Sequence, residues 1–407
     1  MSTSRKRNGT KLLRIRMMTS IVALLVIASV SILMISSSDA PPAPVPAMIE
    51  YSSHVPIFIN GDAQFNNTGF PNNGVVSGNG TASNPYVIEG WNISATSVNG
   101  ISIQNTSMHF IVRDCFVHDG GWSHHGIFLY NSFNGVLTDN NCSNNTHGIR
   151  LFSSDDNIIS NNTCSDNEYG TYLINSWRNA IRNNTCSSNS VSAIFLTSMS
   201  DWNTLSGNNC SSNDMTGIYL FTQTDHNIID NNNCSNNQVG ITLDLSCDEN
   251  TLTNNTISSN GYLGMDILSC SNNILAWNKI HYNFGFGIFS NPGNFGNVIW
   301  NNSFIGNNGS GSMYEIDHIQ NYDACSGNYW NSSSGYGNYW GDLTSPDAIP
   351  PYGIVDWSYN LTGPGGAKDY YPLTTVAPPI PEFSEMIIPI VGLMMIALIA
   401  GRTRKKP

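Results

Sequence analysis

Acidic side chains recur at a regular interval through the middle of the chain. Asp155, Asp201, Asp225 and Asp248 lie at multiples of about 23 residues, a period in the range of solenoid repeats, and Glu249 follows the last of them. Two carboxyl groups roughly 5 to 10 Å apart are what glycoside hydrolysis requires, and carboxylates are also the ligands that Ca²⁺ prefers. Solvated turn residues are the favoured interpretation. Calcium ligands and catalytic acids stay open, with the candidates Asp201, Asp225, Asp248 and Glu249.

Histidines gather in one loop and recur once beyond it. His118, His124 and His125 lie in the segment 118–125 beside Asp119, and His147 comes later in the chain. Imidazoles with a carboxylate can bind a transition metal, although turns also collect His, Asp and Gly and this spacing matches no established motif. A metal-handling function predicts that the four histidines converge.

Five cysteines share a spacing of about 22 to 24 residues, again within the range of solenoid periods. They are Cys142, Cys164, Cys186, Cys210 and Cys234, and at the same interval Ile257, Ile280 and Phe304 come next. Replacement by large apolar residues favours an inward-facing ladder of small hydrophobic side chains. Disulfides between neighbours and a soft-metal site remain open, although no CxxC-type zinc spacing is present.

Aromatic residues dominate the region after residue 312. The tetrapeptide at 327–330 returns at 337–340, and each copy ends in Tyr-Trp. These rings either cover the open end of a core, which is the favoured interpretation, or form a platform for sugar rings. The glycan-stacking candidates are Tyr329, Trp330, Tyr339 and Trp340.

The acids and the cysteines follow one repeat, which ends before the aromatic-rich region. Segments of the type Gly/Ala-Ile-x-Leu begin at Gly126, Gly148, Ala193, Gly217 and Gly240, and Gly170-Thr-Tyr-Leu and Gly264-Met-Asp-Ile occupy matching positions. Each period holds three short β-like pieces separated by turn-forming Asn, Ser, Asp and Gly. A persistent period of this length is typical of a solenoid. We therefore predict an all-β, right-handed parallel β-helix with about 22–24 residues per coil.

Asparagines recur at two corners of the predicted coil. One set is Asn157, Asn179, Asn203, Asn227, Asn250 and Asn273, and the other is a series of doublets beginning with 161–162 and 183–184. Asparagine tolerates left-handed backbone conformations, and its amide can bond to the asparagine above and below. We expect stacked structural ladders. About fifteen Asn-x-Ser/Thr sequons overlap them and would allow glycosylation of an exported protein.

Charge is distributed unevenly along the chain. Between the two apolar runs lie six basic residues and all 28 acidic ones, a formal charge of −22. Such a surface repels phosphate backbones, so a nucleic-acid partner is not expected. The run 17–35 comes after basic residues and predicts a signal peptide or a transmembrane helix, either of which exports the central part of the chain. The shorter run 386–401 precedes a basic tail and predicts a membrane anchor.

The predicted organisation results from these features. Its segments are a basic cytoplasmic region (1–16), the signal or transmembrane helix (17–35), a Pro-rich linker (36–54), an N-terminal cap with the first strands (55–98), the coils (99–312), an aromatic-rich C-terminal cap (313–375), a linker (376–385), a transmembrane segment (386–401) and a basic cytoplasmic tail (402–407).

Several motifs resemble those of a known group. Phe58-Ile59-Asn60-Gly61-Asp62, the segment from Asn84 to Trp91, the Asn-Asn-Thr-Cys-Ser coils and the terminal Gly-Asn-Tyr-Trp are similar to archaeal surface proteins of the right-handed β-helix class, with NosD-like, carbohydrate-binding and sugar-hydrolase type repeats. The resemblance covers about 55–375. Many relatives carry a calcium-like acidic segment after Gly-Asn-Tyr-Trp, whereas 341–347 holds only two acids here. Pro381-Glu382-Phe383 resembles a PEF-type signal for a sortase-like enzyme.

We expect an extracytoplasmic, membrane-anchored β-helix at the cell surface that acts in display, adhesion or glycan binding. Glycans, envelope proteins and the membrane are the expected partners, and no cofactor is predicted apart from the open calcium site. A polysaccharide lyase or glycosidase is the first alternative, because that fold class includes enzymes. A NosD-like metal-handling accessory protein is the second.

Overall fold

The computed structural model describes residues 51–66, 73–313, 315–344, 347 and 353–375, and these form a parallel β-helix. The predicted all-β solenoid is confirmed. The apolar runs 17–35 and 386–401, residues 36–50 of the Pro-rich linker, the linker 376–385 and the PEF tripeptide lie outside the described residues. The last residues of the Pro-rich linker, 51–54, are described and contain the strand Ser52–Ser53. Within the described part, no helix is long and apolar enough to cross a bilayer.

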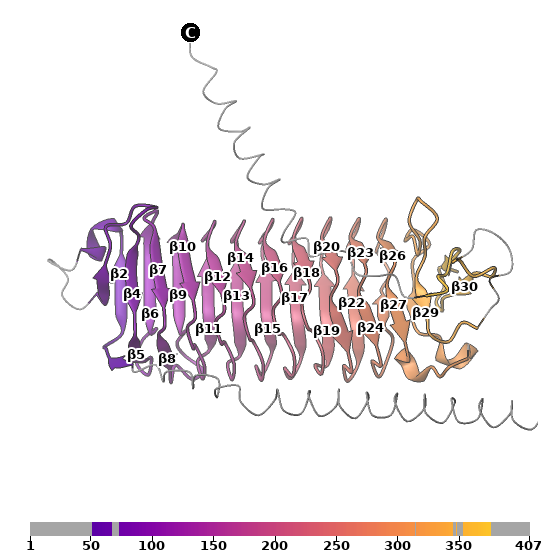
Figure 1. Ribbon diagram of the computed structural model, residues 1–407, viewed down its shortest axis with the longest axis horizontal. Coiled ribbons are helices and arrows are strands. Elements are labelled where there is room, and N and C mark those ends of the chain that lie inside the picture. The colour runs from indigo at the N-terminus through magenta and orange to yellow at the C-terminus, as the bar shows by residue number, and fades with distance from the viewer. Residues whose placement is uncertain (1–50, 67–72, 314, 345–346, 348–352, 376–407) are drawn as a thin grey trace, which may run out of the picture. The chain divides into compact units, whose positions relative to one another are not determined.

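The first long sheet, sheet I, contains eleven strands, one from each successive coil (Figure 1). Its strands are all parallel, and those in the middle have six residues each. In order they are β2 (Ile57–Asn60), β6 (Ile101–Thr106), β9 (Ile127–Ser132), β11 (His147–Phe152), β13 (Tyr169–Ile174), β15 (Ser192–Thr197), β17 (Thr216–Phe221), β19 (Val239–Asp244), β22 (Leu263–Leu268), β25 (Ile288–Ser290) and β28 (Tyr322–Asp323).

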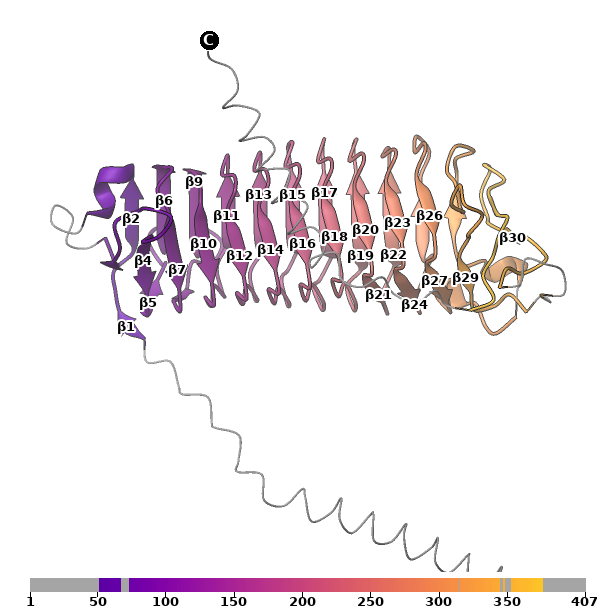
Figure 2. The ribbon, with the colours of Figure 1, turned by 45° about the horizontal axis from the view of Figure 1, so that its top comes forward.

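The second long sheet, sheet II, also has eleven strands, and only its first pair is antiparallel. Turning the molecule shows both sheets running through the same stack of coils (Figure 2). The strands are β3 (Val75–Ser77), β4 (Tyr86–Glu89), β7 (Phe110–Arg113), β10 (Gly135–Thr138), β12 (Ile158–Ser160), β14 (Ala180–Arg182), β16 (Thr204–Ser206), β18 (Ile228–Asp230), β20 (Thr251–Thr253), β23 (Ile274–Ala276) and β26 (Val298–Trp300).

The third side of the coil is narrower. In the middle coils it is reduced to single bridges, such as Thr163 to Thr185, and it widens into strands only near the ends. These are β1 (Ser52–Ser53), β5 (Trp91–Ser94) and β8 (Phe116–His118), then β21 (Thr256–Ser258), β24 (Lys279–His281), β27 (Ser303–Ile305) and β29 (Tyr339–Trp340). Three 3₁₀ turns, η1 (Asp62–Phe65), η2 (Asn307–Gly309) and η3 (Ile316–His318), and the β30 (Tyr359–Asn360) and β31 (Lys368–Asp369) hairpin complete the described elements.

Alternation along each strand explains the core. In β11, Ile149 and Leu151 are fully buried while Arg150 lies on the outer face, as the two-residue period of a strand requires. The five ladder cysteines are fully buried as well, and all nine cysteines are free thiols. Burial raises the pKa of Cys142 and Cys210 well above the usual thiol value, so these thiols are apolar filling rather than nucleophiles.

Three asparagine ladders hold the corners of the coils together. In each, the backbone N–H of one asparagine donates to Oδ1 of the asparagine one coil further on, and at many steps the Nδ2 donates to the same oxygen. Asn162 donates to Asn184 over 2.9 and 3.0 Å in this way. The predicted ladders through Asn157 and Asn162 are both present, and a third runs from Asn145 to Asn307. The residue before the ladder asparagine at this corner takes a left-handed conformation, with φ of 56° at Asn161, 54° at Asn183 and 65° at Gly207.

The C-terminal region closes the end of the β-helix. Trp330 and Trp340 are each only 1% exposed, and their Nε1 atoms donate to Asp323 and Asp369 at 2.7 and 2.9 Å. Trp340 stacks on Phe304 of the last regular coil and on Tyr359. The rings therefore cover the open end of the core. As platforms for sugars, Trp330 and Trp340 were wrong candidates because their faces are buried; of the four, Tyr329 is the exposed one, at 57%.

Candidate functional site

The predicted acidic column exists, and one oxygen of each carboxylate is used to hold the corner. Oδ1 of Asp201, Asp225 and Asp248 accepts the backbone N–H of the next coil, at 2.8, 2.8 and 2.6 Å. Burial raises the pKa of Asp201 and Asp225. Glu249 points to His226, 3.2 Å away. This arrangement favours the interpretation of the column as turn-stabilising residues.

The predicted histidine cluster forms only in part. His125 and His147 meet, with their Nδ1 atoms 2.8 Å apart. His118 instead contacts Asp119 and Asn92, at 2.8 and 2.7 Å, on the third side of the coil. No partner of His124 Nδ1 is found among the described residues, although that atom is buried. The four side chains therefore do not share one site.

The outer face of sheet I carries a feature that residue types alone did not reveal. One column, held in register by parallel pairing, contains outward side chains from successive strands: Phe128, Arg150, Tyr172, Phe195, Tyr219, Thr242, Asp266, Phe289 and Tyr322. Neighbouring columns add more rings. We define the aromatic strip as Phe128, Tyr130, Phe152, Tyr169, Tyr172, Phe195, Tyr219 and Phe221.

The rings of the aromatic strip stack along the axis of the β-helix. Centroids of Tyr172 and Phe195, and of Phe195 and Tyr219, are 5.0 Å apart, with interplanar angles of 18° and 30°. Carbon atoms in contact lie about 3.5 to 4.0 Å apart, so rings with this centroid spacing are offset. Each ring thus leaves part of its face uncovered by the next. The strip stabilises neighbouring strands, and it offers partly exposed rings on either side of Phe195, which is itself only 9% exposed.

One end of the strip is cationic, and we define the cationic end as His125, His147 and Arg150. Arg150 lies between the rings of Phe128 and Tyr172, with Cζ 5.5 and 5.6 Å from their centroids. Its Nη1 contacts Nε2 of His125 at 2.8 Å. Burial, followed by the charge of Arg150, lowers the pKa of His125 to about 4, and burial also lowers the pKa of His147 strongly. Both imidazoles are neutral at physiological pH.

The other end is acidic, and we define the acidic end as Asp244 and Asp266. The hydroxyl of Tyr219 donates to Oδ2 of Asp244 at 3.1 Å, and Asn291 donates to Asp266 at 2.7 Å. Burial, and then the charge of Asp244, raises the pKa of Asp266 to about 6. A carboxyl group with a raised pKa next to a second carboxyl group is an arrangement suited to acid–base chemistry.

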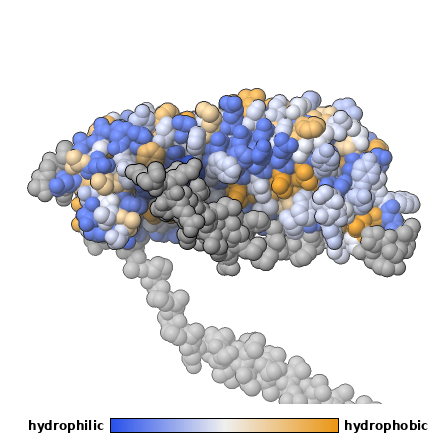
Figure 3. Space-filling model, turned by 90° about the horizontal axis from the view of Figure 1, so that it is seen from above, coloured by the Kyte–Doolittle hydropathy of each residue, from blue (hydrophilic) through white to orange (hydrophobic). Residues whose placement is uncertain are grey.

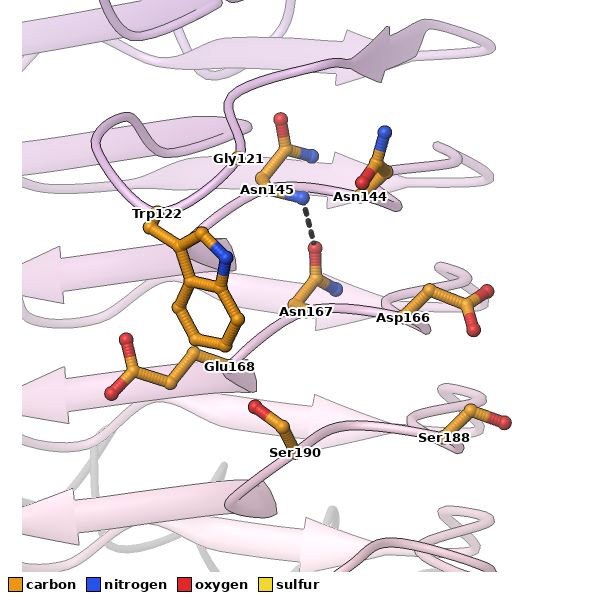
Figure 4. Close-up of a pocket in the computed structure, with 9 residues that line it drawn as sticks. All are labelled: Gly121, Trp122, Asn144, Asn145, Asp166, Asn167, Glu168, Ser188 and Ser190. Carbon is orange, nitrogen blue, oxygen red and sulfur yellow. Dashed lines mark hydrogen bonds between the residues drawn. The ribbon is translucent and has the colours of Figure 1, made fainter.

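A pocket of about 280 Å³ adjoins the cationic end. The indole of Trp122, 77% exposed, projects toward Glu168 of a following coil, and polar side chains of successive coils lie beside it (Figure 4). These polar side chains include Asp166, Ser188 and Ser190. Glu168 immediately precedes Tyr169 of the aromatic strip and acts electrostatically on it. An exposed ring above carboxylates and hydroxyls can bind a polyhydroxylated ligand.

The sequence does contain the signal for the aromatic strip. It is the third residue of each Gly/Ala-Ile-x-Leu segment, which reads Phe, Arg, Tyr, Phe, Tyr, Thr and Asp from residue 128 to 266. Because the Ile and Leu on either side face the core, this position must face outward. A search for acids and histidines by spacing passes over it.

The fold is an all-β solenoid, and the outer face of sheet I carries aromatic and charged side chains. A family model described as periplasmic copper-binding protein (NosD) matches residues 58–239 and 203–345, so the chain belongs to the NosD family. The description agrees with an extracytoplasmic location. No curated protein matches the chain.

Two solved structures illustrate how widely this fold is shared. The A-module of the mannuronan C-5 epimerase AlgE6 of Azotobacter vinelandii is 12% identical, with a TM-score of 0.50 over 62% of this chain and 77% of the module. The Dettilon tailspike protein is 16% identical, with a TM-score of 0.46 over 64% of this chain and 54% of the tailspike. At these identities, the likeness concerns the fold alone.

The family description names copper, for which nitrogen and sulfur donors are the relevant ligands. His125 and His147 are neutral and adjacent, but the guanidinium of Arg150 already occupies Nε2 of His125 and places a positive charge there. No group of three or more His, Cys, Asp or Glu side chains in the described part of the chain is arranged to hold a metal ion. The cysteine side chains are buried in the core. These residues do not fit a copper site.

Proposed function

We propose that this protein is an extracytoplasmic β-helix that binds an extended glycan along the aromatic strip of sheet I. The observation that carries the proposal is the register of the strip, which repeats an outward ring on consecutive strands from β9 to β17. Neighbouring parallel strands are about 4.8 Å apart, so the strip offers a periodic apolar track to a periodic polymer.

The surroundings of the strip support a sugar rather than a lipid or an apolar peptide. Sugar rings present C–H groups to the faces of aromatic rings and hydroxyls to polar neighbours. The Trp122 pocket supplies carboxylates, amides and hydroxyls at one edge, and the acidic end supplies two further acceptors. On the face shown in Figure 3, hydrophilic surface predominates and hydrophobic side chains occur in separate small groups.

Tethering is part of the same proposal. The apolar runs 17–35 and 386–401 would hold the β-helix at the outer surface of a membrane, where it would act in display or adhesion among glycans and envelope proteins. An archaeal origin, processing by a sortase-like enzyme and glycosylation of exposed sequons stay predictions from the sequence.

The test measures binding of the full-length protein to immobilised neutral and uronate-containing polysaccharides, with and without Ca²⁺. A detergent without a sugar headgroup keeps the apolar ends in solution without competing for the site. We expect Tyr172→Ala to weaken binding about tenfold or more, because a stacked ring contributes about 1–3 kcal/mol at comparable sites. Trp202→Ala is the matched control, since Trp202 is an exposed ring on a different corner of the coil. Equal loss in both variants would contradict the proposal.

A glycan-cleaving enzyme is the second candidate function, and the acidic end is the observation that favours it. Its acids would be Asp244 and Asp266 in place of the predicted Asp201, Asp225 and Asp248. New chain ends or unsaturated products in the same binding assay, lost in Asp266→Asn, would establish it. Binding without new chain ends would leave a binding protein.

A further inference from the structure

Arg150 is a cation without an anion. No carboxylate of the described residues lies within ion-pair distance of it, whereas Arg113 and Arg178 are paired with Glu89 and with Asp155 and Asp156. Its Nε is buried and has no hydrogen-bond partner among the described residues. A half-buried guanidinium without a carboxylate partner keeps its positive charge, and an anionic oxygen at its accessible part would pair with it. Arg182 also lacks an ion pair among the described residues, but only Arg150 lies between two aromatic rings.

The neighbours of Arg150 hold it in place without neutralising it. A guanidinium can only donate, so Nε2 of His125 must accept from Nη1. The proton of neutral His125 then resides on Nδ1 and is donated to Nδ1 of His147. Phe128 and Tyr172 flank the guanidinium on either side. The side chain is therefore oriented by two uncharged imidazoles and two rings.

A second position in the same column carries the opposite charge. Asp266 occupies the position of Arg150 five strands further along sheet I, and Asp244 lies beside it in β19. At about 4.8 Å per strand, these charges are about 24 Å apart, which exceeds the Debye length of about 8 Å at physiological ionic strength. The two ends of the strip thus act on separate parts of a bound polymer.

Resting on the glycan-binding function above, we propose that Arg150 anchors an anionic substituent, a carboxylate or a sulfate ester, on an otherwise neutral stretch of glycan. An acid on every sugar would place negative charge against Asp244 and Asp266, so isolated anionic groups fit the strip better than a homopolymer of uronic acids. Arg150 then determines both specificity and the direction in which the polymer lies.

The first test observes Arg150 directly. The Nε–H signals of the ten arginines are recorded by ¹⁵N NMR in the full-length protein, and Arg150→Gln identifies the signal of Arg150. Sodium glucuronate and glucose 6-sulfate are titrated separately, with methyl glucoside and sodium chloride at matched ionic strength as controls. We expect one or both anionic sugars to shift the Arg150 signal with saturation, and the two arms separate carboxylate from sulfate. The neutral sugar and chloride should leave it unchanged.

The matched control residue is Arg182, which lies on sheet II and has no ion pair with any described residue. If neither anionic sugar shifts Arg150 with saturation, or if Arg182 shifts in parallel, the inference is overturned. The signals of Arg113 and Arg178 report any general effect of the added salt on existing ion pairs.

A second measurement separates this inference from the function on which it rests. Wild-type protein, Arg150→Gln and Arg182→Gln are tested on a neutral β-glucan, on xanthan, which carries uronate on some of its sugars, and on polygalacturonate. We expect xanthan to bind best and to lose about tenfold in Arg150→Gln alone. Equal binding of the neutral glucan by wild type and Arg150→Gln, with no preference for xanthan, would overturn the anionic anchor while supporting glycan binding. Loss of all polymer binding despite a saturable Arg150 shift would overturn glycan binding and keep the anion site.

Discussion

Asp266 illustrates how the environment of one residue sets both its chemistry and its effect on stability. Its carboxyl is half-buried on the outer face of β22, accepts one bond from Asn291 and lies near the charge of Asp244. These surroundings raise its pKa to about 6 from a usual value of 3.8. The folded state therefore binds a proton more readily than the unfolded chain does.

We predict that Asp266→Asn is more stable than the wild type at pH 7.5 and equally stable at pH 4. Because the folded pKa is raised, the stabilisation from the protonated carboxyl is complete below about pH 4 and is lost as the pH rises through 6. The difference at pH 7.5 should be about 1 kcal/mol, which allows for solvent screening of a partly exposed group. Denaturant unfolding at several pH values measures it.

Asp214→Asn provides the matched control, since Asp214 is exposed and lies on a turn of the same β-helix. Its stability should follow the wild type at every pH. If the difference in unfolding free energy between Asp266→Asn and the wild type does not change with pH, the raised pKa of Asp266 is not its cause.

Trp122 supplies a second prediction at this scale. Its ring is 77% exposed, so Trp122→Ala should change the free energy of unfolding by no more than about 0.5 kcal/mol. Glycan binding should weaken several-fold, because the pocket beside Glu168 loses its one aromatic wall. Trp357→Ala, at a ring that is 67% exposed in the C-terminal cap, should leave binding unchanged. Matching losses in the two variants would remove Trp122 from the site.

At the scale of the coil, the asparagine ladders explain why the repeat tolerates little variation at its corners. Asn232 is 1% exposed, and its Oδ1 accepts both the backbone N–H and the Nδ2 of Asn208 at 2.9 Å. Its own Nδ2 donates to the carbonyl of Leu205 at 3.0 Å. One side chain thus satisfies several buried groups of the neighbouring coil.

We predict that Asn232→Ala lowers the free energy of unfolding by about 3 kcal/mol or more, because each buried group left unpaired costs about 1–3 kcal/mol. The adjacent Asn233→Ala should cost about 0.5 kcal/mol or less, since Asn233 is exposed and makes one side-chain bond, to Asn209 at 3.2 Å. Equilibrium unfolding of the two variants compares them. Similar losses would mean that the ladder contributes nothing beyond turn propensity.

How much of a coil could be predicted from sequence depended on whether its residues repeat. The Gly/Ala-Ile-x-Leu segments indicated the register of sheet I, and the spacing of Cys164 and of Asn157 indicated an inward slot and a corner. The third asparagine ladder and the aromatic strip also repeat, but a search for acids and histidines overlooks them. The contact of His125 with His147 and Arg150 depends on side-chain directions across coils, which spacing alone does not determine.

At the scale of the whole described β-helix, the ladders share one direction. In all three, N–H groups point toward the C-terminal cap, so each ladder ends with donors that lack a further asparagine. The ladders end at Asn328, Asn338 and Gln320, which donate to Asp323, Asp369 and Asp342. All three aspartates are fully buried. Aligned N–H dipoles favour negative charge at the end toward which they point, as at the N-terminus of a helix.

No pattern in the sequence predicts the aspartates at which the ladders end. They belong to the cap, where the repeat has ended, and their separations from the side chains that they accept, 5, 22 and 31 residues, share no common spacing. In the sequence, Asp342 is one of only two acids in segment 341–347, where many relatives carry a calcium-like acidic segment. It accepts instead from Gln320 and from the hydroxyl of Tyr359, at 2.5 and 3.0 Å, so hydrogen-bond donors already engage both of its oxygens.

Asp369→Asn should therefore affect the whole molecule. Both oxygens of Asp369 accept N–H groups, from Asn338 and Trp340 at one oxygen and from Tyr371 at the other. The amide of asparagine keeps only one acceptor oxygen. Its NH₂ group takes the place of the other oxygen and faces N–H groups that then have no acceptor. We expect a loss of about 2 kcal/mol in unfolding free energy. We also expect greater self-association, because a loosened cap exposes the last strands of both long sheets.

Denaturant unfolding and light scattering measure these two effects together. Asp317→Asn is the control within the same cap, since Asp317 is exposed in η3, and it should change neither quantity. Destabilisation of Asp369→Asn without association would show that the cap stays docked by its tryptophans alone. Association without destabilisation would contradict a role for Asp369 in ending the ladder. The last strands are expected to become exposed only when the bonds from Asn338 and Trp340 are broken.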